Sequence, residues 1–250
     1  MRIACIAMAF LFALPSALAA AERTADEIIS AAQDQWRGDT SEATLTMVIH
    51  RPDWERTMTI KAFTRGADKS IFWITEPPRD AGNGTLKRGT DMWTYNPKVN
   101  RVIKLPPSMM SQSWMGSDFS NHDLSRSDTI VRDYDHSIAE TREEDGHTVY
   151  VIESPAKPTA PVIWGSLRFE IRDDDVLLKE EYYDEDGVMV KQLVTERIEE
   201  MGGRLLPVVM KMERVEESGD YTKLIYEEVA FDMNLPDNMF TRASLRNPRR

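Results

Sequence analysis

Cysteine is almost absent from this 250-residue sequence, in which Cys5 is the only one. A single cysteine cannot form an internal disulfide. Cys5 also lies within an N-terminal stretch that we expect to be removed, which excludes thiol catalysis and a cysteine-ligated metal in the mature protein. The fold must therefore be stabilised by its hydrophobic core alone.

Long apolar runs are also scarce. Residues 3–14 form one that follows Arg2 and precedes Ala17-Leu18-Ala19, a small-residue pattern typical of signal-peptide cleavage. This run is shorter than the ~20 residues of a membrane-spanning helix. Cys5 lies at its start, whereas a lipoprotein needs cysteine at the cleavage point. We expect residues 1–20 to be a signal peptide and residues 21–250 to be a single exported domain in the periplasm.

Positive charge is in the minority, with 31 Lys and Arg against 42 Asp and Glu and a net charge of -11. Nucleic-acid binding needs clustered cations, so this balance argues against a nucleic acid as partner and equally against docking on anionic lipid surfaces.

Histidine is rare as well. His50, His122, His136 and His147 show no metal-ligand spacing, and no serine lies in a G-x-S-x-G motif. Asp118, His122 and Asp123 suggest either a metal cluster or helix-capping carboxylates, and we favour capping because Asp and Ser are common at helix starts. The sequence therefore predicts no metal site, no cofactor and no enzymatic activity.

The periodicity of the apolar residues predicts a mainly β protein with a few helices. Thr24 and Glu27 form a capping box before an apolar stripe at Ile28, Ala32 and Trp36, which indicates a helix that ends at Gly38. Alternating strands follow from residue 44 onward, and hairpin turns are indicated at Asp145-Gly146, Asp186-Gly187, Gly202-Gly203 and Ser218-Gly219. About eleven strands in one antiparallel sheet curl into a barrel or part-barrel, whose concave face needs filling.

The segment at residues 106–126 is a candidate to fill that face, together with the N-terminal helix. It has almost no charge and carries Met109, Met110, Trp114 and Met115. Met110 and Trp114 have the spacing of neighbours on a helix. Methionine-rich surfaces adapt to ligands of variable shape, so the segment is either a core plug or a movable helical lid over an apolar cavity.

Three motifs in the middle of the chain resemble one known family. They are Trp93-Thr94-Tyr95-Asn96-Pro97, then residues 101–106 (RVIKLP), then Gly116-Ser117-Asp118-Phe119-Ser120 with Asp123-Leu124. Together with Leu235-Pro236-Asp237 and Phe240 near the end, they resemble the outer-membrane lipoprotein-sorting proteins, relatives of the periplasmic carrier LolA. The resemblance implies a half-barrel of LolA or LolB type, closed by helices, whose interior holds acyl chains of a lipid or lipoprotein. It also implies partnership with an inner-membrane export system.

Two hypotheses of different class follow. In the first, the protein is a non-catalytic, monomeric carrier of lipid or lipoprotein acyl chains. Its cavity wall and lid are then expected at Met47, Ile49, Met58, Ile60, Trp73, Trp93, Tyr95, Ile103, Met109, Met110, Trp114 and Met115. In the second, the protein is an envelope sensor or adaptor that binds a protein segment, and its own side chains fill the interior.

Overall fold

The computed structural model of the chain describes residues 23–125, 129–217 and 219–248. The predicted signal peptide lies outside this part. None of the described helices is long and apolar enough to cross a membrane. The elements in chain order are α1 (Ala25–Arg37), β1 (Thr40–Arg51), β2 (Trp54–Arg65), β3 (Lys69–Glu76), β4 (Gly84–Arg88), β5 (Asp91–Asn96), β6 (Arg101–Lys104), a 3-10 turn (Pro107–Met109), α2 (Asn121–Ser125), α3 (Ile130–Asp133), β7 (Ser137–Glu144), β8 (His147–Pro155), β9 (Ser166–Arg172), β10 (Leu177–Tyr183), β11 (Met189–Met201), β12 (Arg204–Arg214), β13 (Tyr221–Phe231), a second 3-10 turn (Asp237–Met239) and α4 (Arg242–Leu245).

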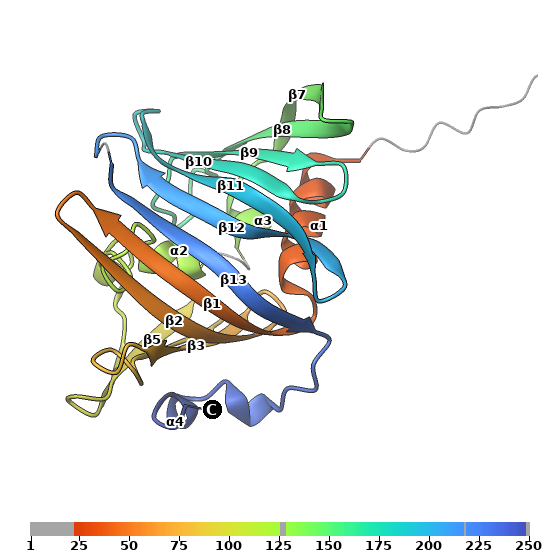
Figure 1. The fold of residues 1–250 in the computed structure, drawn as a ribbon. Helices are drawn as coiled ribbons and strands as arrows, with labels where there is room; N and C mark the ends of the chain where they lie inside the picture. The colour runs from red at the N-terminus through yellow and green to blue at the C-terminus, as the bar shows by residue number, and fades with distance from the viewer. Residues whose placement is uncertain (1–22, 126–128, 218, 249–250) are drawn as a thin grey trace, which may run out of the picture.

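These strands form one antiparallel sheet of thirteen in the order β6-β5-β4-β3-β2-β1-β13-β12-β11-β10-β9-β8-β7. The sheet is open, curved and not closed into a barrel, with β6 and β7 as its edges (Figure 1). The predicted mainly β half-barrel is confirmed. The sheet has thirteen strands, two more than the eleven expected.

The helix signal and the hairpin signals at Asp145-Gly146, Asp186-Gly187 and Gly202-Gly203 are also confirmed, whereas Ser218 of the fourth predicted turn lies outside the described residues. The Thr24 and Glu27 capping box is formed at the start of α1, and Gly38 ends the helix. Asp145 and Gly146 join β7 to β8 with φ of 51° and 81°, and Gly202-Gly203 joins β11 to β12 with positive φ at both residues. Positive φ at both central residues is what a type I′ hairpin turn requires.

The pairing register assigns every strand residue to one of two faces, because opposed residues on antiparallel strands point to the same side. We call the face that packs against α1 the inner face. It carries Leu45, which opposes Ile60 on β2 and Tyr226 on β13. The other side is the outer face.

The chain topology explains what covers the inner face. Since β6 and β7 lie at opposite edges, residues 105–136 must cross the sheet to connect them. We call residues 106–125 the cover segment. Its Trp114 packs with the inner residues of β1–β3, whereas α1 packs against β12, β9 and β7. Two separate pieces of chain therefore share this face.

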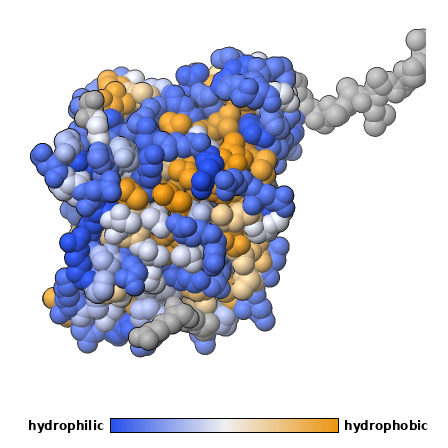
Figure 2. All heavy atoms as spheres, in the orientation of Figure 1, coloured by the Kyte–Doolittle hydropathy of each residue, from blue (hydrophilic) through white to orange (hydrophobic). Residues whose placement is uncertain are grey.

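The outer face of β3–β5 is covered by the C-terminal segment, residues 233–246. Its Leu235, Met239, Phe240 and Leu245 form a buried cluster with strand residues that include Trp73. Gly84 permits this close packing, since a Cβ at that position would lie 3.0 Å from both the Leu245 and Trp73 side chains. Figure 2 shows one side of the molecule, where hydrophilic residues predominate and hydrophobic residues gather mainly over β11 and β12 near α1.

Candidate functional site

A cavity of about 220 Å³ lies between α1, the inner face and the cover segment. It is larger than the ~150 Å³ apolar cavity known to bind benzene and smaller than the ~300–1,000 Å³ pockets of drug-sized ligands. Its wall is chiefly apolar. The apolar and aromatic lining residues are Ile29, Ala32 and Trp36 of α1; Ala43, Leu45, Ile60, Ala62, Phe72, Phe169, Ile171, Leu177, Tyr182, Leu193, Pro207, Leu224, Tyr226 and Val229 of the sheet; Ile130 of α3; and Trp114, Phe119 and Leu124 of the cover segment.

The hollow exists because small side chains meet where large ones would fill it. Ala43 and Ala62 oppose each other directly on β1 and β2, and Ala32 of α1 also lines the cavity. Inner residues on the same strands, such as Met47 and Met58, are large and fully buried. The alternation continues without a break, but side-chain volume falls at this one level of the sheet. An apolar ligand can enter there without displacing a core residue.

One wall of the cavity contains a half-buried polar pair. The indole N–H of Trp36 donates a hydrogen bond to the Tyr226 hydroxyl, and the two rings meet edge to face with centroids 6.4 Å apart. Burial raises the pKa of Tyr226 to about 12. The hydroxyl therefore stays neutral at physiological pH, and this wall carries no charge from Tyr226.

A buried ion pair anchors the cover segment beside the cavity. The Lys191 ammonium on β11 pairs with the Asp123 carboxylate, and both side chains are almost fully buried. The Lys191 nitrogen also lies 4.9 Å and 4.8 Å from the ring centroids of Trp164 and Tyr182, within cation–π range. Asp123 accepts a hydrogen bond from the Ser120 backbone N–H as well, which confirms its predicted capping role at α2.

A second anchor lies a few residues earlier. The Asp118 carboxylate is 1% exposed and accepts hydrogen bonds from Arg51 at 2.9 and 3.1 Å and from the Thr222 hydroxyl at 2.7 Å. Arg51 also pairs with Asp220 at 3.2 Å. The Asp118 carboxylate therefore binds Arg51 and Thr222 instead of capping a helix as predicted, and Asp118 and Asp123 attach the segment to the sheet by two ion pairs.

The first half of the cover segment differs from its predicted form. The expectation that Met110 and Trp114 share a helix is wrong, because helical structure there is limited to the 3-10 turn ending at Met109. The chain then folds back on itself: Ser113 bridges Ser120, and the Trp114 backbone N–H donates to the Phe119 carbonyl at 2.7 Å. These local hydrogen bonds take the place of a helical ladder.

The predicted site residues divide between the two faces. Met47, Ile49, Met58 and Ile60 lie on the inner face in one cluster with Trp114, and Met115 packs against it. Of these, Ile60 and Trp114 line the cavity. Met109 and Met110 are half-buried in the cover segment.

Three residues expected on the concave face lie on the other side. Trp73, Trp93 and Tyr95 are outer-face residues that pack with the C-terminal segment. The strand around Trp73 is apolar on both faces, so alternation could not assign its orientation. Ile103 has inner-face register opposite Thr94, but it lies on the edge strand β6 and is 48% exposed.

Several cavity residues were not predicted as such. Trp36 was recognised on the apolar stripe of α1, but its approach to Tyr226 joins positions 190 residues apart. Ala43 and Ala62 were passed over because small residues carry little apolar signal. Small residues inside an otherwise bulky alternation are the sequence feature that could have indicated the hollow.

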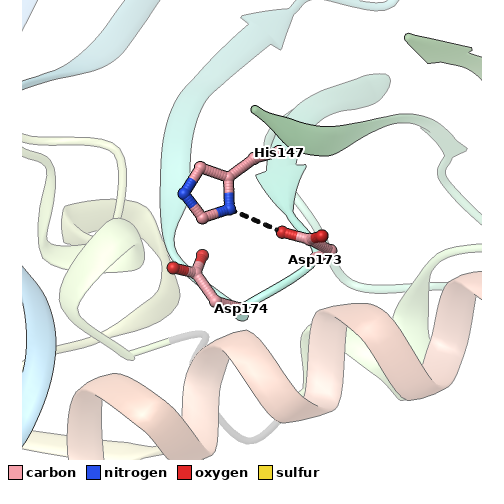
Figure 3. A group of neighbouring side chains, drawn as sticks. All are labelled: His147, Asp173 and Asp174. Carbon is pink, nitrogen blue, oxygen red and sulfur yellow. Dashed lines mark hydrogen bonds and ion pairs between the residues drawn. The ribbon is translucent and has the colours of Figure 1, made fainter. Parts of the chain in front are cut away.

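Of the residues that the structure describes, His147, Asp173 and Asp174 come nearest to a metal-binding set (Figure 3). His147 Nδ1 lies 2.8 Å from an Asp173 oxygen. Arg172 lies between the other atoms, with one guanidinium nitrogen 2.6 Å from both His147 Nε2 and Asp174. Arg172 thus already supplies the positive charge that a metal ion would bring, and these residues form a hydrogen-bonded surface cluster.

Comparisons with known proteins agree on the fold. A family model described as that of an uncharacterized protein matches residues 66–247. No curated protein matches the chain significantly. Among solved structures, a DUF1329 family protein from Desulfovibrio piger is 25% identical, with a TM-score of 0.79 over 88% of this chain and 97% of that one.

Two further structures carry more specific descriptions. A putative outer membrane lipoprotein-sorting protein domain from Vibrio parahaemolyticus is 21% identical, with a TM-score of 0.78 over 89% of this chain and 98% of that one. A LolA superfamily protein from Nitrosomonas europaea is 24% identical, with a TM-score of 0.75 over 89% and 100%. The chain therefore belongs to the family of uncharacterized proteins whose model it matches, and its fold is that of the outer-membrane lipoprotein-sorting, LolA-like proteins, as the sequence motifs predicted.

Proposed function

We propose that this protein is a non-catalytic periplasmic carrier that binds an acyl chain of a lipid or lipoprotein in the cavity beneath α1. The observation that carries the proposal is the apolar hollow itself, which lies at the Ala43 and Ala62 level of a half-barrel that is otherwise well filled. Burial of apolar surface contributes roughly 25 cal/mol per Å², so even part of an acyl chain gains several kcal/mol there.

The two halves of the cover segment suit a carrier in different ways. Asp118 and Asp123 fix the second half to the sheet by buried ion pairs. Residues 106–117 contain no acidic or basic side chain. The hydrogen bonds of this half to the sheet run from the Trp114 indole N–H to the Thr85 hydroxyl at 3.0 Å, and from Arg56 and Arg51 to the Met115 and Gly116 carbonyl oxygens at 3.3 and 3.5 Å. The neutral bond contributes about 1 kcal/mol, and no buried ion pair holds this half within the described residues. The first half can therefore move while the second stays attached, which enlarges the cavity for a longer chain.

The predicted export signal and the LolA-like fold support a place for this carrier in the periplasm. In this role the protein acts as a monomer and takes its cargo from an inner-membrane export system. Release follows when a partner binds the acyl chain more tightly than the cavity does.

A cavity-filling substitution tests the proposal. Ala62→Leu adds a branched side chain to the hollow, and we expect it to weaken binding of a fluorescent fatty acid by about tenfold or more. Ala230→Leu is the matched control, because Ala230 lies exposed on neighbouring β13. Both variants should unfold at nearly the wild-type denaturant concentration.

Native mass spectrometry of the mature protein, purified from envelope extract without detergent, identifies the cargo. A bound mass that matches a lipid or an acylated peptide supports the carrier. A ligand-free mass together with no uptake of the fatty-acid probe overturns it, and leaves the adaptor that binds a protein segment.

A further inference from the structure

Basic residues are concentrated in two stretches of this acidic sequence. Residues 81–117 contain five basic residues, and Asp91 is the only acidic residue among them. No acidic residue follows Asp237, whereas Arg242 and Arg246 lie in the same stretch. The two stretches are far apart in the chain, and each departs from the overall excess of 42 acidic over 31 basic residues.

The fold brings these two stretches together. Helix α4 packs against β4 and β5 at one end of the molecule (Figure 1). Between them lies an open pocket of about 560 Å³, lined by Arg88, Trp93, Lys104, Arg242 and Arg246 among others. We call these five residues the basic end. It gathers four cations around one indole ring.

Most of this positive charge is not neutralised within the protein. Lys104 pairs with Asp91 at 2.7 Å. Arg88, Arg242 and Arg246 are exposed, and none of the three pairs with a carboxylate in the part of the chain that the structure describes. Several other cations of the sheet have an acidic neighbour, as the half-buried Lys211 has in Glu213 at 2.8 Å. Three adjacent uncompensated arginines therefore form a local positive surface.

An aromatic side chain lies among these cations, whereas the exposed aliphatic side chains nearby do not belong to the basic end. Val99 is 60% exposed at the turn between β5 and β6, and Ile103 is 48% exposed on β6 but has inner-face register. Trp93 is half-buried, with the Lys104 nitrogen 5.7 Å from its ring centroid. Cations beside a tryptophan are typical of surfaces that lie at a membrane interface.

Protection of the sheet edge does not explain the sign of this charge. Edge strands carry charged side chains to prevent pairing with other chains, and either sign serves. The opposite edge, β7, carries Glu140, Glu143 and Glu144. The protein thus uses acidic residues at one edge and basic residues at the other, and the basic sign needs a further reason.

We infer that the basic end docks on a membrane surface rich in anionic phospholipid headgroups. The phosphates of the headgroups pair with Arg88, Arg242 and Arg246, while Trp93 lies at the level of the interface. The net charge of -11 does not prevent this. Charges are screened over about 8–10 Å at physiological ionic strength, so a membrane in contact with the basic end responds to the nearest cations. The inference goes beyond the carrier proposal and does not depend on it, because docking needs no acyl cargo.

Vesicle sedimentation tests the inference. The full mature protein is mixed with vesicles of phosphatidylcholine alone or of phosphatidylcholine with phosphatidylglycerol. We expect binding to the anionic vesicles only, and its loss in high salt. Each cation near an anionic surface contributes about fivefold to binding, so the triple variant Arg88→Gln, Arg242→Gln, Arg246→Gln should bind about a hundredfold more weakly.

The matched control is Arg132→Gln, Lys157→Gln, Arg197→Gln, which changes the net charge equally at exposed sites outside the basic end. It should bind anionic vesicles like the wild type, and both variants should keep the wild-type fatty-acid affinity. Equal loss of vesicle binding in both triple variants overturns the inference. Competition by inorganic phosphate at constant ionic strength also overturns it in favour of a free-anion site. Sedimentation without vesicles at low salt overturns it in favour of contact between the basic and acidic edges of two copies.

Discussion

The sheet of this protein has two apolar faces, and the segments that cover them fill the space above them to different extents. On the outer face of β3–β5, Trp73 and Leu86 are buried under Phe240 and Leu245 of the C-terminal segment. On the inner face of β1–β3, the cover segment and α1 leave a cavity of about 220 Å³ around Ala43 and Ala62. Both faces have the composition of a core, and only one has room for a ligand.

The difference teaches that apolarity does not by itself mark a binding face. The outer face is complete because the C-terminal segment supplies side chains that fit it. The inner face is closed by two segments from different parts of the chain, and the small residues between them leave the hollow. A face becomes a candidate binding site where the covering segments and the side chains of the sheet do not fill the space between them.

The largest expected change in stability, and the strongest test of this comparison, comes from truncating one phenylalanine on each face. Phe240 is 1% exposed, so Phe240→Ala should destabilise the protein by about 3–5 kcal/mol through lost burial and a new cavity. Phe72→Ala should cost about half as much, because Phe72 already borders empty space. Urea unfolding measures both. Equal losses would mean that the inner face is packed as tightly as the outer one.

Removal of one cover anchor is expected to have the next largest effect. Lys191→Met removes the buried ion pair between Lys191 and Asp123, which costs about 3 kcal/mol. It should also speed uptake of a fatty-acid probe, measured by stopped-flow fluorescence, because the cover segment loses an attachment. Lys211→Met is the control, since its exposed pair with Glu213 contributes at most about 1 kcal/mol. Unchanged uptake in Lys191→Met would show that this anchor does not restrain the cover.

Alkaline pH should weaken the inner wall in particular. A tyrosine in an unfolded chain ionises near pH 10, whereas burial raises the pKa of folded Tyr226 to about 12. The contribution of the neutral hydroxyl is therefore complete below pH 10 and is lost as the pH rises toward 12, a change of about 2–3 kcal/mol. Tyr226→Phe should remove this part of the pH dependence in urea unfolding curves. Identical slopes in both proteins would contradict the burial of Tyr226.

The smallest effect comes from a matched pair of tryptophans. The Trp114 indole N–H donates to Thr85 on the inner side, and that of Trp73 donates to the Leu245 carbonyl at 3.2 Å on the outer side. Replacement of either by phenylalanine should cost about 1 kcal/mol for the hydrogen bond. Only Trp114→Phe should also change the affinity for the fatty-acid probe. An equal change in Trp73→Phe would place the ligand outside the proposed cavity.

Much of the local structure could be read from the sequence. The capping box at Thr24, the alternation along β1 and the turn at Asp145-Gly146 are local signals, and each formed the predicted element. The family motifs likewise predicted a half-barrel, which the solved structures share. The candidate site was predicted only in part, through Ile60 and Trp114.

The remaining site residues depend on contacts between distant parts of the chain. Residues 71–74 are apolar at every position, so the period of two could not place Trp73 on either face. Its position under Leu245 follows from the path of the C-terminal segment, which no local pattern encodes.

The sequence by itself thus determined the secondary structure, the antiparallel hairpins and the family, because these depend on side-chain periodicity, turn chemistry and motifs that neighbouring residues carry. Only the tertiary structure decided which apolar face is filled, where the hollow lies and which cations gather at one end. Those features depend on the volumes and charges of side chains that lie far apart in the sequence and meet only in the fold. Trp36 and Tyr226, for example, are 190 residues apart.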